Sequence, residues 1–214
     1  MDRLRYEKEA WHSGLFFIVG VDEAGRGPLA GPVVAAAVAF ERDFLEHGGD
    51  DLFPGLTDSK ALTERPREYF FEQLQQCRAV RIGCSAVGSG RIDEINILKA
   101  TWEAMAGAVS QISPAPDLAL VDGNPVRGLS CKSKSIVKGD SQSLSISAAS
   151  VIAKVTRDRL MIEIDAEFPQ YGFARHKGYG TAEHLAAIHR YGPCRYHRKT
   201  FRPVSDLNQG ELSL

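Results

Sequence analysis

Hydrophobic positions along the chain fall into short apolar runs separated by amphipathic segments. Residues 15–22 (LFFIVGVD), 32–40 (PVVAAAVAF) and 116–123 (PDLALVDG) are apolar and rich in β-branched or aromatic side chains, as buried strands are. Residues 79–87 alternate between polar and apolar positions, which predicts another strand, and the lysine-rich residues 132–140 are typical of an edge strand. The chain therefore opens with two strands joined by a glycine-rich loop.

Helical spacing appears between and after these strands. Thr63 and Pro66 favour the start of a helix over residues 64–77, and apolar side chains at 98, 102, 105 and 109 predict one over residues 95–112. Positions 144, 148, 152 and 155 share one helical face, and their small neighbours allow close packing on a sheet. A further helix is expected over residues 180–190. This order of elements predicts an α/β fold with a mixed sheet flanked by helices and a C-terminal helical extension.

The composition predicts one domain over residues 1–214, with a core at about 15–167, a basic aromatic extension at about 168–202 and a flexible tail at 203–214. Four cysteines form no CxxC pair, and no apolar stretch reaches membrane-spanning length. The N-terminus mixes acids and bases, unlike a signal peptide. We therefore expect a cytoplasmic protein with reduced thiols and no membrane association; no obligate protein partner is evident.

Basic residues are concentrated near the C-terminus, although the net charge of the chain is only −1. Residues 171–202 carry seven Lys or Arg and one acid, together with six aromatics and four histidines. A nucleic acid would have to be held by such a local patch. Arg195, Arg198 and Lys199 in the run RYHRKTF are predicted to contact phosphates, and a solvated surface strand is the alternative.

The loop in residues 20–32 (GVDEAGRGPLAGP) matches neither common phosphate-binding fingerprint. Its glycines are spaced G-x-G-x-x-x-G with a strand after them, whereas the dinucleotide fingerprint needs a helix there, and no Lys-Ser or Lys-Thr follows as in a P-loop. The glycines of Gly25-Arg26-Gly27 would let the backbone approach a ligand, with Arg26 available for a phosphate. A tight β-turn is the alternative interpretation.

Carboxylates recur at the ends of predicted strands. Asp22 and Glu23 follow the first strand, Asp122 ends another, and Asp140 precedes the long helix. A single aspartate at such a position is often a turn residue, and Asp140 could be a helix N-cap. Clustered carboxylates, however, repel one another unless a cation neutralises them, and Mg²⁺ and Mn²⁺ take oxygen ligands. The pattern predicts a metal site, although adjacent strand residues point to opposite faces unless the strand bends.

Long motifs in a fixed order resemble type 2 ribonuclease H, the ribonuclease HII family, which cleaves RNA within RNA–DNA hybrids. The motifs are VDEAGRGPLAGPVVAAAV, TDSKALT, VDGN, KGD, SISAASVIAKVTRDRLM and FARHKGYGT, and together they cover residues of about 17–190. The resemblance implies a ribonuclease H-like fold and a site of four carboxylates, which correspond to Asp22, Glu23, Asp122 and Asp140. It also implies cleavage on the 5′ side of a ribonucleotide, leaving 5′-phosphate and 3′-hydroxyl ends.

The chemistry expected of such a site is metal-dependent hydrolysis. Two Mn²⁺ or Mg²⁺ ions about 4 Å apart can activate a water and stabilise the leaving oxygen, so no side-chain nucleophile is needed. By resemblance, Gly25-Arg26-Gly27 reads the ribose 2′-hydroxyl and Tyr179 packs against the sugar beside the scissile junction. Further substrate contacts are predicted for Lys60, in TDSK, and for His176 and Lys177, in HKGYG.

The expected substrates are RNA–DNA hybrids and duplex DNA with embedded ribonucleotides. Two alternatives remain: a DNA-directed nuclease of the same fold, and a hybrid-binding protein without catalysis. A requirement for the 2′-hydroxyl separates the first alternative from a ribonuclease, and metal-dependent turnover excludes the second.

Overall fold

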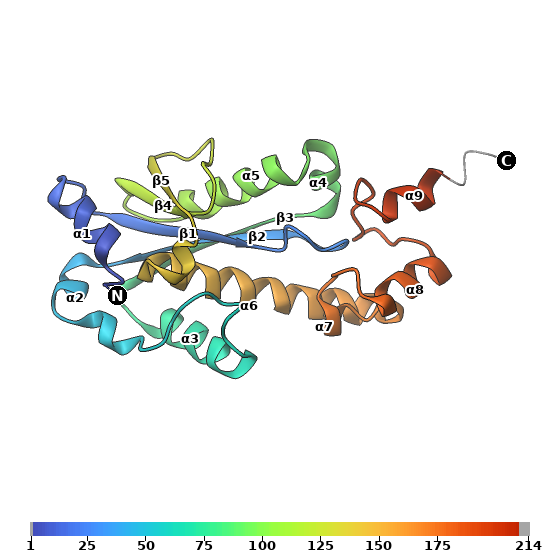
Figure 1. Ribbon diagram of the computed structural model, residues 1–214, viewed down its shortest axis with the longest axis horizontal. Helices are drawn as coiled ribbons and strands as arrows, with labels where there is room; N and C mark the ends of the chain where they lie inside the picture. The colour runs from blue at the N-terminus through green and yellow to red at the C-terminus, as the bar shows by residue number, and fades with distance from the viewer. Residues whose placement is uncertain (1, 210–214) are drawn as a thin grey trace.

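A computed structural model describes residues 2–209 of the chain. Within that range one mixed sheet has the strand order β3-β2-β1-β4-β5 (Figure 1). β1, β2 and β3 pair antiparallel, whereas β4 runs parallel to β1 and β5 parallel to β4. The mixed sheet expected from the sequence is confirmed. Its strands are β1 (Ile18–Ala24), β2 (Val33–Phe40), β3 (Val80–Val87), β4 (Leu118–Asp122) and β5 (Lys132–Ile136).

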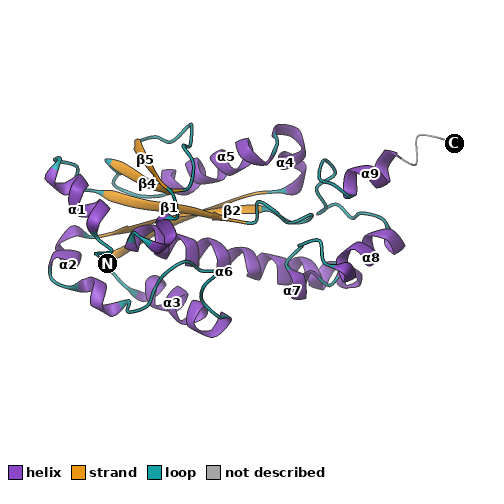
Figure 2. Ribbon diagram, in the orientation of Figure 1, coloured by secondary structure: helices purple, strands orange, loops and turns teal. Residues whose placement is uncertain are grey.

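Helices cover both faces of the sheet (Figure 2). β2 is buried throughout and shows how: Ala36 and Val38 pack with α6 and α3, whereas Ala35 and Ala37 face α5. Alternate residues of a strand point to opposite faces, so one apolar strand contributes to two cores. The covering helices are α3 (Glu64–Gln76), α4 (Ser89–Ile95), α5 (Ile97–Ser110) and α6 (Leu144–Glu167).

The long helix α6 lies unusually close to β1. At Gly20 an added Cβ would collide with the backbone of Ser145 at the start of α6. Small residues such as Ala148 and Ala149 are fully buried along the same helix. The close packing expected from the small residues of this segment is therefore present, and it brings α6 against the carboxyl end of β1.

Several elements differ from the expected pattern. The helix expected over residues 95–112 begins only at Ile97, because Asn96 adopts a positive φ of 68° and caps α5 by accepting from the N–H groups of Leu98 and Lys99. The edge strand expected over residues 132–140 ends at Ile136 and is followed by the short helix η2 (Gly139–Ser141). Helices α1 (Arg5–His12), α2 (Arg42–Glu46) and η1 (Gly49–Leu52) were not expected.

The extension after α6 is helical, as expected. It contains η3 (Pro169–Tyr171), α7 (Phe173–His176), α8 (Ala182–Tyr191) and α9 (Val204–Gln209). α9 falls within the range 203–214 for which a flexible tail is expected, and its first residue, Val204, is fully buried. Residues 210–214 lie outside the described part. No described helix combines the length and apolar character needed to span a bilayer.

Candidate metal centre and substrate cleft

Three aspartates meet at the carboxyl ends of β1 and β4. The parallel register of β1 and β4 ends with Val21 paired to Val121, so the next residues, Asp22 and Asp122, lie side by side where the two strands stop pairing. Asp140 is brought to them by η2, where the N–H of Gly139 donates to Asp122 Oδ1 over 2.7 Å. One carboxylate oxygen from each of the three aspartates lies within 4.8 Å of the others. The sheet and η2 thus bring together three of the four carboxylates that the sequence indicates as metal ligands.

The cluster concentrates negative charge that the protein does not neutralise. Burial, then Glu23 and Asp122, raise the pKa of Asp22 well above its usual value. Burial, then Asp122 and Asp58, raise the pKa of Asp140 to about 6. Burial and mutual repulsion thus disfavour the ionised aspartates, and a bound cation would favour them. A set of carboxylate oxygens is the donor set that Mg²⁺ and Mn²⁺ prefer, so the residues fit a divalent metal.

The N-cap alternative for Asp140 is wrong. Ser143 is the N-cap of α6, and its side-chain oxygen accepts from the N–H of Ile146. Asp140 instead lies inside η2, and its backbone carbonyl accepts a hydrogen bond from the Ser147 hydroxyl over 2.6 Å. Its carboxylate is therefore free of a capping role and faces the other aspartates.

Glu23 lies beside the three aspartates, and its carboxylate forms an ion pair with Arg26 at 3.2 Å. Burial raises the pKa of Glu23, while the Arg26 guanidinium acts in the opposite direction. β1 continues to Ala24, so Glu23 and Asp22 are successive residues of a strand. The alternation of side chains that complicated the sequence prediction accounts for the separation of Glu23 from the cluster.

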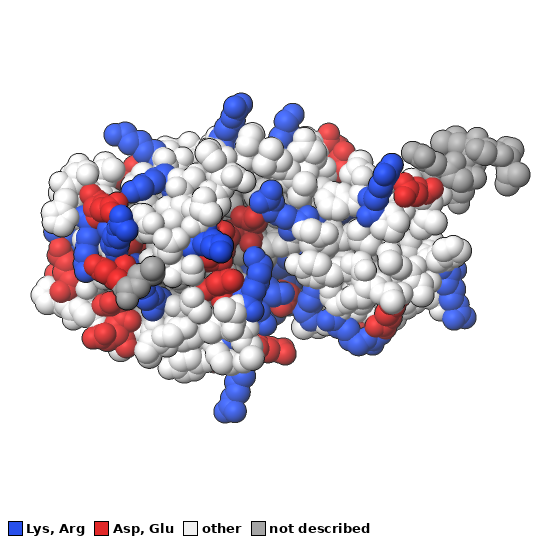
Figure 3. All heavy atoms as spheres, in the orientation of Figure 1, with Lys and Arg blue, Asp and Glu red and all other residues white. Residues whose placement is uncertain are grey.

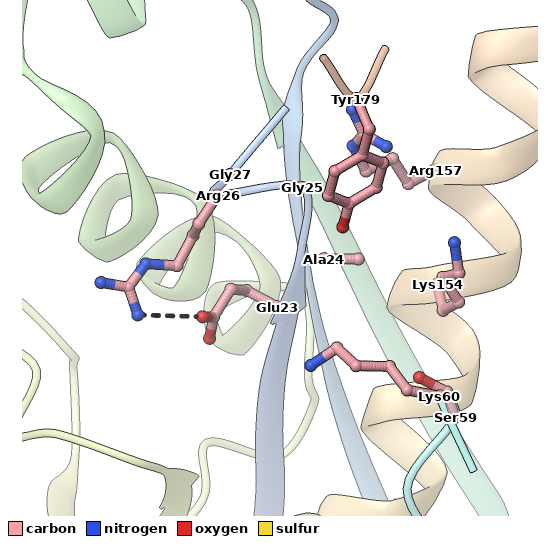
Figure 4. A pocket seen from close by; sticks show the side chains of 10 residues that line it. All are labelled: Glu23, Ala24, Gly25, Arg26, Gly27, Ser59, Lys60, Lys154, Arg157 and Tyr179. Carbon is pink, nitrogen blue, oxygen red and sulfur yellow. Dashed lines mark hydrogen bonds and ion pairs between the residues drawn. The ribbon is translucent and has the colours of Figure 1, made fainter. Parts of the chain in front are cut away.

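Lys60 supplies a positive charge next to these acids. The preceding residue, Ser59, is held to α6 by a hydrogen bond with Ser150, 2.9 Å between hydroxyl oxygens. Burial on its own would lower the pKa of Lys60, but Asp22 and other nearby carboxylates raise it above its usual value. Figure 4 shows the ammonium directed toward the side of the cleft where Glu23 lies.

A cleft of about 180 Å³ opens beside the carboxylates. Tyr179 is 46% exposed at its rim, and an added Cβ on Gly27 would lie 3.9 Å from Tyr179 Cε1, so the ring and the glycine loop face each other across it (Figure 4). Figure 3 shows basic and acidic side chains adjoining near the middle of one face of the molecule. The cleft is lined by Glu23, Ala24, Gly25, Arg26, Gly27, Ser59, Lys60, Lys154, Arg157 and Tyr179.

His176 and Lys177 lie behind the tyrosine. His176 uses both ring nitrogens within the fold: Nε2 hydrogen-bonds the Tyr171 carbonyl over 2.7 Å, and Nδ1 accepts from the N–H of Gly178. Lys177 adopts a positive φ of 51°, and its ammonium donates to the carbonyl of Ala174. In this structure both residues shape the turn that presents Tyr179.

The three basic residues of the C-terminal run lie in different environments. Arg195 is exposed and pairs with Glu167, and Lys199 is exposed. Arg198 has no exposed surface and its guanidinium donates to backbone carbonyls, so in this structure it is not available for the phosphate contact predicted for it. The segment is not a surface strand with alternately exposed side chains, because its backbone pairs with the 25–31 loop and Arg198 lies beneath that loop.

Sequence reasoning missed a group of buried polar side chains behind the cleft. His184 Nε2 lies 3.0 Å from His197 Nε2, and Arg157, on α6, donates to the carbonyls of Ala30 and Pro32. Burial lowers the pKa of each histidine to about 4. The many histidine and aromatic residues in 171–202 could have indicated a buried polar cluster. The positive charge of the segment instead favoured an exposed, phosphate-binding surface.

Comparison with known proteins identifies the family. The model of the family described as Ribonuclease HII matches residues 19–204. The chain belongs to the ribonuclease HII family. Its sequence is 53% identical over 203 residues to ribonuclease HII of Geobacillus thermodenitrificans, covering 95% of this chain and 75% of that protein. It is 51% identical over 201 residues to ribonuclease HII of Geobacter metallireducens, covering 94% of this chain and 91% of that protein.

Solved structures give the same result for the fold. The crystal structure of ribonuclease H2 from Pyrococcus horikoshii OT3 superposes with a TM-score of 0.74 at 25% identity, covering 92% of this chain and all of that one. The chain is therefore a ribonuclease H endonuclease with the ribonuclease H-like fold. The family acts on RNA–DNA hybrids and uses divalent metal, for which the aspartate cluster is suited.

Proposed function

We propose that this enzyme cleaves both the RNA strand of RNA–DNA hybrids and the 5′ side of single ribonucleotides embedded in duplex DNA, leaving 5′-phosphate and 3′-hydroxyl ends. The observation that carries the proposal is the adjacency of two features. One carboxylate oxygen from each of Asp22, Asp122 and Asp140 lies within 4.8 Å of the others, and Glu23 lines the adjoining cleft between Gly27 and Tyr179. A phosphate at the aspartates thus places its neighbouring sugar at the glycine loop.

The aspartates and Glu23 are proposed to hold Mn²⁺ or Mg²⁺. Two bound ions supply Lewis acids that activate a water and stabilise the leaving 3′ oxygen. To hold an ion, Glu23 would give up its ion pair with Arg26, and Lys60, which also lines the cleft, would contact the phosphate. The raised pKa values of Asp22 and Asp140, caused first by burial and then by repulsion from neighbouring carboxylates, support the proposal, because a bound cation would favour the ionised forms.

Recognition of the ribonucleotide is assigned to Gly25-Arg26-Gly27 and Tyr179. Gly27 has no side chain between its backbone and the tyrosine ring, which leaves room for a sugar. The exposed ring of Tyr179 offers an apolar face on which a deoxyribose can pack. Two supporting roles complete the proposal. The turn that carries Tyr179 is supported by His176 and Lys177. Phosphates farther from the scissile bond are contacted by Arg195 and Lys199.

Cleavage-site mapping tests the proposal. Duplexes with zero, one and four ribonucleotides in one strand are incubated with Mg²⁺ or with Mn²⁺, and the ends are identified. We expect no cleavage of the all-DNA duplex and a cut on the 5′ side of the single ribonucleotide. Cleavage of the all-DNA duplex would indicate a DNA-directed nuclease instead. The Asp122→Asn variant, prepared in the same way, controls for contaminating nuclease.

A further inference from the structure

Arg198, from the C-terminal extension, lies directly beneath the glycine loop. Its side chain is completely buried. Nη2 donates to the carbonyl of Gly25 over 2.5 Å, Nη1 donates to that of Arg26 over 2.9 Å, and Nε and Nη2 both reach that of Gly31. One guanidinium thus binds three backbone carbonyls of the loop.

No described acidic residue forms a salt bridge with Arg198. Burial lowers its pKa to about 9, and the nearby Arg157 acts in the same direction. A buried guanidinium without an ion pair is costly, so its five donors must be satisfied by other groups. Here the loop carbonyls accept four hydrogen bonds from the guanidinium, and the planar fork of an arginine matches carbonyls that a lysine could not span.

The segment that carries Arg198 is fixed to the loop by its backbone as well. Ala30 and His197 form an isolated antiparallel bridge. The N–H of Arg198 donates to the carbonyl of Leu29, and the N–H of Gly31 donates to that of Tyr196. Both the backbone and the side chain of Arg198 are therefore bonded to the loop, which fixes the position of the guanidinium relative to it.

The carbonyl contacts determine where the loop's N–H groups point. In a planar trans peptide, the carbonyl of one residue and the N–H of the next point in opposite directions. Because the carbonyls of Gly25 and Arg26 point inward to Arg198, the N–H groups of Arg26 and Gly27 point outward. Both residues are exposed, and within residues 2–209 neither N–H has a hydrogen-bond acceptor.

We propose that Arg198 is a positioning residue for substrate specificity: by binding the carbonyls of Gly25 and Arg26, it aims two successive N–H groups at the oxygen of a ribose 2′-hydroxyl. Successive backbone N–H groups form a concave site for an oxygen acceptor. The inference rests on the proposed function, since it explains how the loop distinguishes ribose from deoxyribose. The C-terminal extension then acts on specificity from behind the cleft.

A lysine at position 198 tests this role, because its ammonium keeps the charge but cannot bind all three carbonyls. We measure Kd by fluorescence anisotropy, without divalent cation, for a duplex with one ribonucleotide and for the all-DNA duplex of the same sequence. The Kd for the all-DNA duplex divided by the Kd for the ribonucleotide duplex reports recognition of the 2′-hydroxyl. In Arg198→Lys we expect that ratio to fall about tenfold for each N–H that is lost as a donor, with the all-DNA Kd unchanged.

Ile188→Ala is the matched control. Ile188 is 2% exposed in the same C-terminal apolar cluster as Leu29 and Ala30, but it does not bind the loop carbonyls. We expect this variant to lose thermal stability and to keep the Kd ratio of the wild type. An unchanged ratio in Arg198→Lys would overturn the inference, as would an equal loss of the ratio in Ile188→Ala. A wild type that shows no preference for the ribonucleotide would instead overturn the proposed function.

A second measurement applies if Arg198→Lys does not fold. The backbone amide resonances of Arg26 and Gly27 in the wild type are followed by NMR as each duplex is added. We expect both amides to shift with the ribonucleotide duplex more than with the all-DNA duplex. Identical shifts with the two duplexes would show that these N–H groups do not bind the 2′-hydroxyl, which contradicts the inference.

Discussion

Two regions of this enzyme bury ionisable side chains, and they differ in how the charge is satisfied. At the ends of β1 and β4, three aspartates lie together; within residues 2–209 none of them forms a salt bridge, although Lys60 lies nearby, and burial raises the pKa of Asp22. Behind the cleft, Arg198 is satisfied by backbone carbonyls, and His184 and His197 are held neutral by burial. The aspartate cluster keeps negative charge that a cation can bind. The polar groups behind the cleft are used within the fold, where they hold the glycine loop and the C-terminal extension in place.

The contrast indicates which region acts on the substrate directly. Unneutralised acids that face a cleft are costly in the free protein and are favoured only when a cation binds. Backbone-bound arginines and neutral histidines have no such unmet requirement. We therefore expect substitutions in the aspartate cluster to reduce activity while sparing stability, and those in the buried histidine pair to affect stability first.

Substitution of a central aspartate should give the largest effect. In Asp22→Asn or Asp122→Asn we expect kcat to fall by more than about 100-fold, which exceeds the usual loss for residues outside the metal's ligands. The free energy of unfolding of the metal-free protein should stay the same or rise, because like-charge repulsion is relieved. Activity at saturating Mg²⁺ or Mn²⁺ and urea unfolding in chelator measure the two quantities. Near-normal turnover would remove that aspartate from the site.

A smaller effect is expected at Tyr179. We predict that Tyr179→Ala lowers kcat/KM at a single embedded ribonucleotide about tenfold, the scale of losing one base- or sugar-packing aromatic contact. Within a long hybrid the loss should be smaller, because neighbouring registers can substitute. Steady-state kinetics on the two substrates measures the difference. Equal losses on both would make Tyr179 a general binding residue.

The glycine loop offers a matched pair of substitutions. At Gly27 an added Cβ meets only Tyr179, at 3.9 Å, so Gly27→Ala should fold normally and lose about tenfold in kcat/KM on both substrates, the value of one hydrogen bond kept from the sugar. At Gly25 the φ is 96° and an added Cβ would collide with Arg157. Gly25→Ala should therefore lower the melting temperature as well. Full activity in Gly27→Ala would show that nothing approaches the loop there.

The buried histidines should make stability pH-dependent. Their pKa is about 4 in the fold and about 6.5 in the unfolded chain, so only the unfolded state takes up these protons between pH 6.5 and 4. The free energy of unfolding should therefore fall as pH drops through this window, by up to about 3 kcal/mol for one histidine. Urea unfolding across the window measures the slope. The double variant His184→Gln/His197→Gln should flatten it.

The aspartates should act on stability in the opposite direction. The folded-state pKa of Asp140 is raised to about 6, so the folded protein binds more protons than the unfolded chain between pH 3.8 and 6. The stability of the metal-free protein that depends on this group is lost as pH rises through that window. Asp140→Asn should consequently steepen the acid-side fall caused by the histidines. An unchanged slope would mean that Asp140 does not titrate with the cluster.

The exposed basic residues should have the smallest effect. Replacing Lys199 with Ala should reduce the slope of log K against log salt for duplex binding by about 0.9 if it contacts one phosphate. Arg195→Ala should change the slope less, because Arg195 is engaged by Glu167. The cleavage position should not move in either variant. Binding titrations at several salt concentrations provide the measurement.

The strands, the α6 helix and the aspartates were predictable from the sequence because each depends on a local pattern. β2 is apolar throughout and β4 is apolar up to its last residue, and Asp22 and Asp122 come near strand ends, where ligand sites form in α/β sheets. Helix α1 was not predictable, because it is short and half of its eight residues are charged. It is held by Glu7, which accepts from the hydroxyls of Ser143 and Ser145, more than a hundred residues away.

The sequence by itself thus determined the element order, the glycine loop and the acids at the strand ends, since hydrophobic period and turn chemistry act over a few residues. Only the tertiary structure decided that Glu23 pairs with Arg26 beside the cluster, and that Arg198 lies beneath the loop. Burial of a charge depends on partners from distant segments, here the carbonyls of Gly25 and Arg26. A basic run therefore has the same sequence pattern whether it faces solvent or supports a site from within.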